Sequence, residues 1–133
     1  MQMEISFPGG KRVDSSFGSF VVKTDQPQKG GGDGSAPSPF ELFLASIGTC
    51  AGVYALGFCQ ARKISTEGLR VVQTNEMDRD TGQLVTVHID IHVPPGFPEE
   101  YRDAIRRAAE HCAVKKTILA PPEFEMNVKA GPA

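Results

Sequence analysis

The sequence contains little cysteine and almost no net charge. Its three cysteines are too few for the disulfide framework of a small secreted protein and favour a reducing cytoplasm. Lysine and arginine together number 14 against 16 acidic residues, a net charge of −2 that provides no basic surface for nucleic acid or for a membrane. The first residues lack the basic and apolar regions of a secretory signal, and we expect no apolar run of about 20 residues that could span a bilayer.

The remaining composition is that of an ordinary globular domain. Hydrophobic residues make up 40% and charged residues 23% of the 133 residues. A chain of this length can bury a core without disulfide or metal staples, so we expect one domain over residues 1–133. A cytoplasmic location follows from the cysteine content and the expected absence of a signal.

Short β-like runs open the chain at residues 3–7 and 12–24, with Pro8-Gly9-Gly10 as a turn between them. Residues 25–36 are rich in glycine and predict a flexible loop. This loop is not a phosphate-binding loop, because it lacks the Gly-Lys-Ser/Thr ending and no apolar strand precedes it. We therefore expect no nucleotide cofactor.

A long apolar helix is predicted to follow. Ser38 is a suitable N-cap, Pro39 fits the first helical position, and Glu41 is placed to complete a capping box. Apolar residues recur at helical spacing up to Gln60, Arg62 and Lys63, whose polar character indicates the C-terminal end. Because so few side chains in this helix are polar, we expect it to be central and buried on most sides. Gly48, Gly52 and Gly57 within it suggest close packing against another backbone.

The second half of the chain predicts a hairpin, two helices and a final strand. The hairpin comprises strands 69–77 and 83–93, and the second of these places its valines and isoleucines on one face and Thr86, His88, Asp90 and His92 on the other. A helix near 98–110, a short helical turn at 113–119 and a strand at 123–129 complete the chain. Strands and helices that do not alternate as βαβ units predict an α+β fold with antiparallel sheets around the central helix.

Cysteine is the residue type with the most chemical promise. Cys112 is expected at the N-terminal edge of the 113–119 turn, where free amides, the helix dipole, Lys115 and Lys116 favour a thiolate. Cys50 lies inside the apolar helix, where burial raises a thiol pKa unless a cation or a donor approaches it. Both also fit as buried core cysteines. Cys59 lies roughly 180° around the helix from Cys50, so we expect it to be structural.

Metal binding is a weaker hypothesis. His88 and His92 share the polar face of a strand and are expected to point to water. A metal site built from His111, Cys112 and Cys50 is an alternative that the sequence leaves open.

Two motifs resemble those of the osmotically inducible protein C family, which includes the organic hydroperoxide resistance proteins. The first is Pro-Ser-Pro-Phe-Glu-Leu-Phe-Leu-Ala-Ser-Ile-Gly-Thr-Cys, which ends at Cys50. The second is Cys-Ala-Val-Lys-Lys-Thr-Ile, which begins at Cys112. The resemblance implies an OsmC-like intertwined homodimer and a peroxiredoxin-like reduction of organic hydroperoxides. Cys50 would be the peroxidatic thiol and Cys112 the resolving one, without a cofactor or metal, and a dithiol such as a lipoylated protein would be the reductant.

The sequence departs from the well-studied peroxidases of this family at one position. Their Pro-Glu-x-Leu motif orients an arginine beside the reactive thiolate, and aligning its leucine on Leu42 places Phe40 where the glutamate would be. Glu41 is one position away and is explained by its cap. Arg12 is the candidate thiolate-stabilising cation, with Lys11 and Lys29 behind it. The Pro-x-Glu-Leu form resembles a less-characterised branch, so a second hypothesis is a non-peroxidase protein that binds a small molecule or senses redox state at the dimer interface.

Overall fold

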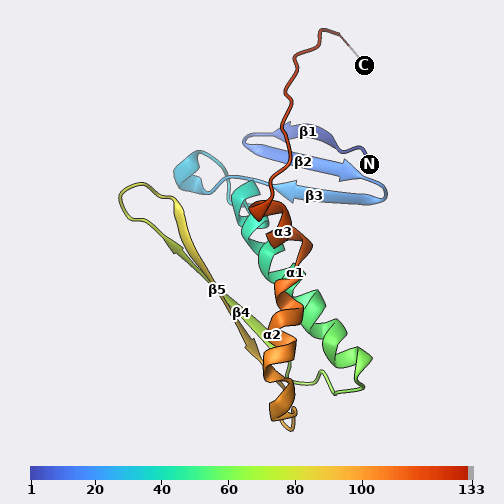
Figure 1. The fold of residues 1–133 in the computed structure, drawn as a ribbon. Coiled ribbons are helices and arrows are strands. Elements are labelled where there is room, and N and C mark those ends of the chain that lie inside the picture. Colours follow the sequence, from blue (N-terminus) through green and yellow to red (C-terminus); the bar gives the residue numbers. More distant parts are fainter. Residues whose placement is uncertain (132–133) are drawn as a thin grey trace.

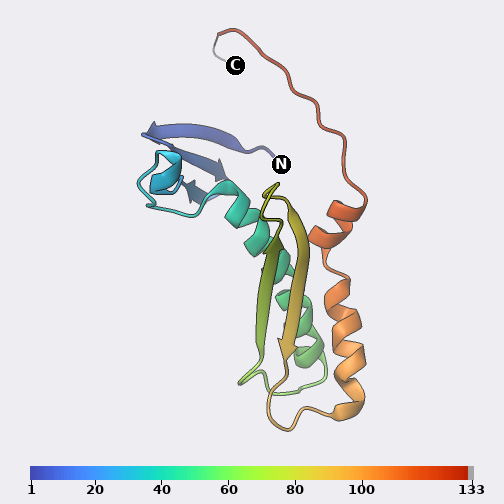
Figure 2. The ribbon, with the colours of Figure 1, turned by 90° about the vertical axis from the view of Figure 1, so that its left-hand side faces the viewer.

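The computed structural model describes residues 1–131 and has an α+β fold with antiparallel sheets and three α-helices, as the sequence predicts. Residues 132–133, the end of the expected domain, lie outside the described residues. Figures 1 and 2 show the β1–β2–β3 sheet across the N-terminal end of α1, while the β4–β5 hairpin and α2 both run along α1.

The N-terminal sheet is a meander of β1 (Glu4–Gly9), β2 (Arg12–Phe17) and β3 (Phe20–Thr24). The first turn is tighter than expected, because Gly9 pairs with Arg12 and only Gly10 and Lys11 lie between them. The predicted run 12–24 is divided by a second two-residue turn, at which Phe17 pairs with Phe20. Gly18 has φ +54° there, and glycine adopts this left-handed conformation without a steric penalty.

The glycine-rich loop is closed at both ends and contains one 3₁₀ turn, η1 (Gln28–Gly30). The Asp25 N–H donates to the Pro37 carbonyl at 3.2 Å, and the Asp25 carboxylate accepts bonds from Gln26 N, Ser35 N and Ser35 Oγ. These donors, the Ser35 hydroxyl first, lower the pKa of Asp25 to about 2. A Cβ at Gly32 would lie 2.1 Å from the Gln26 carbonyl oxygen, so the loop closes this tightly only with glycine there.

Helix α1 (Pro39–Ala61) begins with the predicted capping box. Glu41 N donates to Ser38 Oγ at 3.2 Å, and Ser38 N donates to Glu41 Oε1 at 3.1 Å. The expectation that α1 is buried on most sides is wrong for the single chain. Its buried residues are Ile47, Ala51, Ala55, Phe58 and Cys59. Other large apolar side chains along it remain exposed: Phe40, Phe43, Val53, Tyr54 and Leu56.

By length and composition α1 could also cross a membrane, with a mean hydropathy of 1.8, which corrects the expectation of no such run. The run was not predicted because small polar side chains interrupt the apolar ones in residues 42–61, although none of these residues is charged. Thr49 and Ser46 return their hydroxyl hydrogen bonds to helix carbonyls and do not interrupt the helix. One such helix is weak evidence of a membrane span, since the core helix of a soluble protein has the same composition.

The hairpin of β4 (Arg70–Met77) and β5 (Leu84–His92) has its predicted alternation over most of its length. Val87, Ile89 and Ile91 are partly buried on one face, while His88, Asp90 and His92 are exposed. Val85 is an exception at 63% exposed. It is the unpaired residue of a bulge between the Glu76–Thr86 and Met77–Leu84 pairs, and a bulge re-aims the side chain it carries.

Two helices follow the hairpin as predicted: α2 (Arg102–Glu110), preceded by η2 (Glu99–Tyr101), and α3 (Ala113–Leu119). The core forms where the C-terminal half of α1 meets α2 and the loop before it, and its buried members are Ala55, Phe58, Cys59, Phe97 and Ile105.

The strand predicted at 123–129 is wrong for the single chain. The segment is extended but unpaired, and its alternating apolar side chains are almost fully exposed: Phe124 at 87%, Met126 at 96% and Val128 at 100%. Figures 1 and 2 show it leading away from α3. A strand requires a neighbour for its ladder of hydrogen bonds, and within residues 1–131 this segment reaches none.

Candidate functional site

The fold brings Cys50 and Cys112 together, although about sixty residues separate them in the chain. Cys50 lies in the middle of α1, and Cys112 is the N-cap of α3, whose first turn packs on α1. Both are free thiols; Cys50 is partly exposed and Cys112 is 2% exposed.

The surroundings of Cys50 favour its thiolate. Its pKa is lowered, first because the Cys112 side chain can donate a hydrogen bond to the thiolate. The backbone N–H groups of Val114 and Ala113 then add their own stabilisation, and burial opposes them. These amides belong to the first turn of α3, where N–H groups have no partner within the helix. Besides Cys112, the donors that stabilise the Cys50 thiolate are therefore main-chain amides, and a residue pattern does not reveal such groups.

Cys112 has the opposite character, which corrects the expectation that it is the favoured thiolate. Burial raises the pKa of the Cys112 thiol, and the neighbouring Cys50 sulfur raises it further. The Lys115 N–H still donates to Cys112 Sγ at 3.4 Å, but it does not outweigh burial. The prediction that Cys112 lies at the start of α3 is confirmed. The amides of this helix start lower the pKa of Cys50, however, and burial keeps the pKa of Cys112 raised.

No cationic side chain within residues 1–131 contributes to the lowered pKa of Cys50. Arg12 is exposed at the start of β2, where its Nε donates to the Gly9 carbonyl at 3.3 Å. Phe40 is half exposed and packs on Phe43, with ring centroids 5.7 Å apart. Glu41 is held in its capping box. In a single chain Cys50 is thus stabilised by neutral donors and not by an arginine–glutamate pair.

Cys59 and the strand histidines stay outside this site, as predicted. Cys59 is completely buried in the core, and burial raises its pKa. His88 is exposed and bonds Glu76 Oε1 at 3.0 Å, and His92 faces water. Within residues 1–131 no group of three or more His, Cys, Asp or Glu side chains is arranged to hold a metal ion, so the alternative site of His111, Cys112 and Cys50 does not form.

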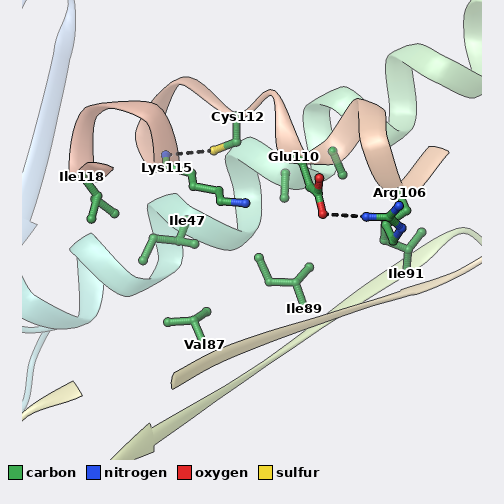
Figure 3. A pocket seen from close by; sticks show the side chains of 11 residues that line it. Ile47, Val87, Ile89, Ile91, Arg106, Glu110, Cys112, Lys115 and Ile118 are labelled. Atoms are coloured by element: carbon green, nitrogen blue, oxygen red, sulfur yellow. Dashed lines mark hydrogen bonds and ion pairs between the residues drawn. The ribbon is translucent and has the colours of Figure 1, made fainter. Parts of the chain in front are cut away.

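An apolar pocket of about 410 Å³ lies beside Cys112, between α1, β5, α2 and α3 (Figure 3). Cys112 is part of its wall, and so are Ile47 and Ala51 of α1, whereas Cys50 itself does not line it. The other lining residues are Val87, Ile89, Ile91, Arg106, Ala109, Glu110, Lys115 and Ile118. The sequence pattern indicated the apolar face of β5, but not that α2 and α3 would enclose space over it.

A family model described as OsmC-like protein matches residues 32–127, which include both cysteines and most of the extended C-terminal segment. No curated protein sequence matches the chain.

Solved structures with the same fold come from several bacteria. A candidate osmotic stress induced and detoxification response protein from Psychrobacter arcticus 273-4 has a TM-score of 0.74 at 22% identity, covering 88% of this chain and 87% of its own. An organic hydroperoxide resistance protein OsmC from Legionella pneumophila has a TM-score of 0.55 at 23% identity, with 89% of each chain covered.

A third structure is that of a candidate organic hydroperoxide resistance protein from Vibrio cholerae, with captopril bound in one of its active sites. Its TM-score is 0.57 at 18% identity, and the match covers 91% of this chain and 86% of that one. At identities this low, the three structures are evidence of a common fold.

Proposed function

The chain belongs to the OsmC-like family, and from this premise we propose that it reduces organic hydroperoxides with Cys50 as the attacking thiol and Cys112 as the resolving thiol. The observation that carries the proposal is the pairing of a stabilised Cys50 thiolate with a protonated, buried Cys112 thiol next to it. Neighbours with the same fold include proteins named for organic hydroperoxide resistance, in agreement with a role in oxidative-stress defence.

The first step is attack of the Cys50 thiolate on the outer oxygen of the hydroperoxide. An S–O bond forms, the O–O bond breaks, and the alkoxide leaves as the alcohol after taking up a proton. Cys50 is oxidised to a sulfenic acid while the peroxide is reduced. The first-turn amides of α3 contribute by keeping Cys50 ionised, because the thiolate is the nucleophile.

The second step is attack of the Cys112 sulfur on the sulfenic sulfur of Cys50. The S–S bond forms as the S–O bond breaks, and the sulfenic hydroxyl leaves with the proton of the Cys112 thiol as water. A high pKa keeps Cys112 protonated and out of competition for the peroxide until then. A dithiol reductant, such as a lipoylated protein, would return both cysteines to thiols through a mixed disulfide while becoming a disulfide itself.

The proposal includes a cytoplasmic homodimer in which the exposed face of α1 and the extended C-terminal segment are covered by the second copy. Two observations support it: large apolar side chains are exposed along α1, and those of residues 124, 126 and 128 alternate as in a strand without a neighbour. In such an assembly a cation from the partner copy, with Arg12 as the candidate, would complete the surroundings of Cys50.

A second function is favoured by two observations: within residues 1–131 no cationic side chain contributes to the Cys50 pKa, and Phe40 stands where the glutamate that orients one would be. A family member of this kind would bind a small molecule or sense redox state in the pocket beside the dithiol, without turnover.

Turnover of cumene hydroperoxide with dihydrolipoamide separates the two functions. We expect activity in the wild type, its loss in Cys50→Ser, and arrest after one oxidation in Cys112→Ser. Cys59→Ser is the matched control, because Cys59 is a free cysteine of the same helix but is confined to the core. Wild-type protein without turnover, or Cys50→Ser with undiminished turnover, would exclude the peroxidase and leave the binding function.

A further inference from the structure

We propose that the pocket selects ligands with an apolar body and one carboxylate group, and that the Lys115 ammonium is the group that recognises the carboxylate. The proposal rests on the proposed function, since it names the class of hydroperoxide that the Cys50–Cys112 site prefers. It also concerns binding itself, which can be measured without turnover.

The body of the pocket requires an apolar ligand. Ile47 and Ala51 of α1 form one wall, and Val87, Ile89 and Ile91 of β5 form the facing one. A volume of about 410 Å³ falls in the range of roughly 300–1,000 Å³ usual for small-molecule sites, which are mostly apolar with a few polar groups that orient the ligand.

Three charged side chains line this apolar space, and two of them neutralise each other. Arg106 Nη1 donates to Glu110 Oε1 at 2.8 Å, and Arg106 Nη2 donates to Asp103 Oδ1 at 2.7 Å. Arg106 is thereby saturated by two carboxylates, and neither it nor Glu110 presents an uncompensated charge to a ligand.

Lys115 is the lining residue whose charge is not compensated. Among residues 1–131 it forms no ion pair. Figure 3 shows its side chain reaching into the space bounded by Ile47, Ile89 and Glu110. A cation beside an apolar wall is complemented by an amphipathic anion, and a carboxylate on an apolar ligand provides one.

Lys115 also connects the pocket to the resolving sulfur, Cys112. Its backbone N–H donates to Cys112 Sγ, while its side chain extends into the pocket that Cys112 lines. A carboxylate at the ammonium therefore holds the apolar body of a ligand close to Cys112, the sulfur that hydrogen-bonds to Cys50. Because the bond to Cys112 comes from the main chain, Lys115→Gln removes the charge and keeps that bond.

The test compares cumene hydroperoxide with its ring-carboxylated analogue, a pair that differs only in the carboxylate. In Lys115→Gln we expect the ratio of kcat/KM for the carboxylated over the uncharged substrate to fall roughly fivefold, the size of a solvent-accessible ion pair. Lys116→Gln is the matched control, because Lys116 is adjacent, equally charged and exposed but does not line the pocket. An unchanged ratio in Lys115→Gln, or an equal fall in Lys116→Gln, would overturn the proposal.

A binding measurement separates this proposal from the proposed function. Calorimetric titration with octanoate and with octan-1-ol needs no turnover. We expect the wild type to bind octanoate more tightly than the alcohol, and Lys115→Gln to lose that preference. If cumene hydroperoxide is not turned over but the octanoate preference holds, the peroxidase fails and the anion site stands. If turnover is found but octanoate binds no better than the alcohol, the anion site fails alone.

Discussion

The backbone N–H of Lys115 donates to Cys112 Sγ at 3.4 Å, so that a thiol caps helix α3. The two preceding amides of the same turn, those of Ala113 and Val114, stabilise the thiolate of Cys50. The first turn of this seven-residue helix thus donates hydrogen bonds to both sulfurs. This arrangement assigns the thiolate to Cys50 and the protonated thiol to Cys112.

Alkylation by iodoacetamide should distinguish the Cys50 thiolate from the protonated Cys112 thiol. Because the pKa of Cys50 is lowered, its thiolate persists as the pH falls below the ordinary cysteine pKa and is lost only below the lowered value. The raised pKa values of Cys112 and Cys59 delay their reaction until higher pH. We expect mass spectrometry to find Cys50 labelled first at neutral pH.

The Cys112→Ala variant should then move the pH profile of Cys50 alkylation upward, since it removes the largest cause of the lowered pKa. Cys112→Ser, which keeps a hydrogen-bond donor, should move the profile less. An identical profile in wild type and Cys112→Ala would show that the main-chain amides alone stabilise the thiolate.

Gly48 is needed where the hairpin touches α1. A Cβ there would lie 2.2 Å from Gln73 Oε1, and Gln73 Nε2 donates to Leu44 O and to Asn75 Oδ1, each at 2.9 Å. Alanine gains about 1 kcal/mol in helix propensity over glycine, but displacing a bonded amide loses roughly 1–3 kcal/mol. We expect Gly48→Ala to lower the free energy of unfolding by urea.

Gly52→Ala is the control for this substitution, because a Cβ at Gly52 meets nothing within 4 Å in the chain. It should raise stability by up to about 1 kcal/mol. A stabilised Gly48→Ala would contradict the contact with Gln73. A destabilised Gly52→Ala would instead place a second copy against this part of α1.

Asp25 should make the protein sensitive to acid. Its pKa of about 2 lies below the ordinary 3.8, so the stability that it contributes is full above about 4 and is lost as the pH falls towards 2. Asp25→Asn should lower the free energy of unfolding at neutral pH. It should also reduce the fall of that free energy between about pH 4 and pH 2, as measured by urea unfolding. Asp33→Asn, at an exposed aspartate of the same loop, should retain the wild-type pH dependence.

The C-terminal segment should control dimer formation. Charges at two of its alternating apolar positions, in the variant Phe124→Asp/Met126→Asp, would disfavour burial against a second copy. We expect light scattering to report a dimer for the wild type and a monomer for this variant. Glu123→Gln/Glu125→Gln, which changes the intervening positions, should remain dimeric. A monomeric wild type would refute the proposed assembly.

Much of the local structure could be predicted because its causes are local. The capping box at Ser38 and Glu41, the alternation of β5 and the start of α3 at Cys112 depend on neighbours within a few residues, and each is found in the structure. The strand at 123–129 failed because alternation of side chains specifies a surface for pairing but does not supply the partner. The turn that divides residues 12–24 was missed because Gly18 resembles an ordinary small residue in a β-like run.

The α+β class, the two cysteine motifs and the family to which they point follow from the order of residues alone. The physical cause of the lowered Cys50 pKa, in contrast, exists only in the folded chain. A thiol pKa depends on burial and on the donors that reach the sulfur, and for Cys50 those donors are Cys112 and backbone amides from a distant turn. Main-chain groups leave no mark on a residue pattern, so the stabilised thiolate of Cys50 became visible only when α3 was placed against α1.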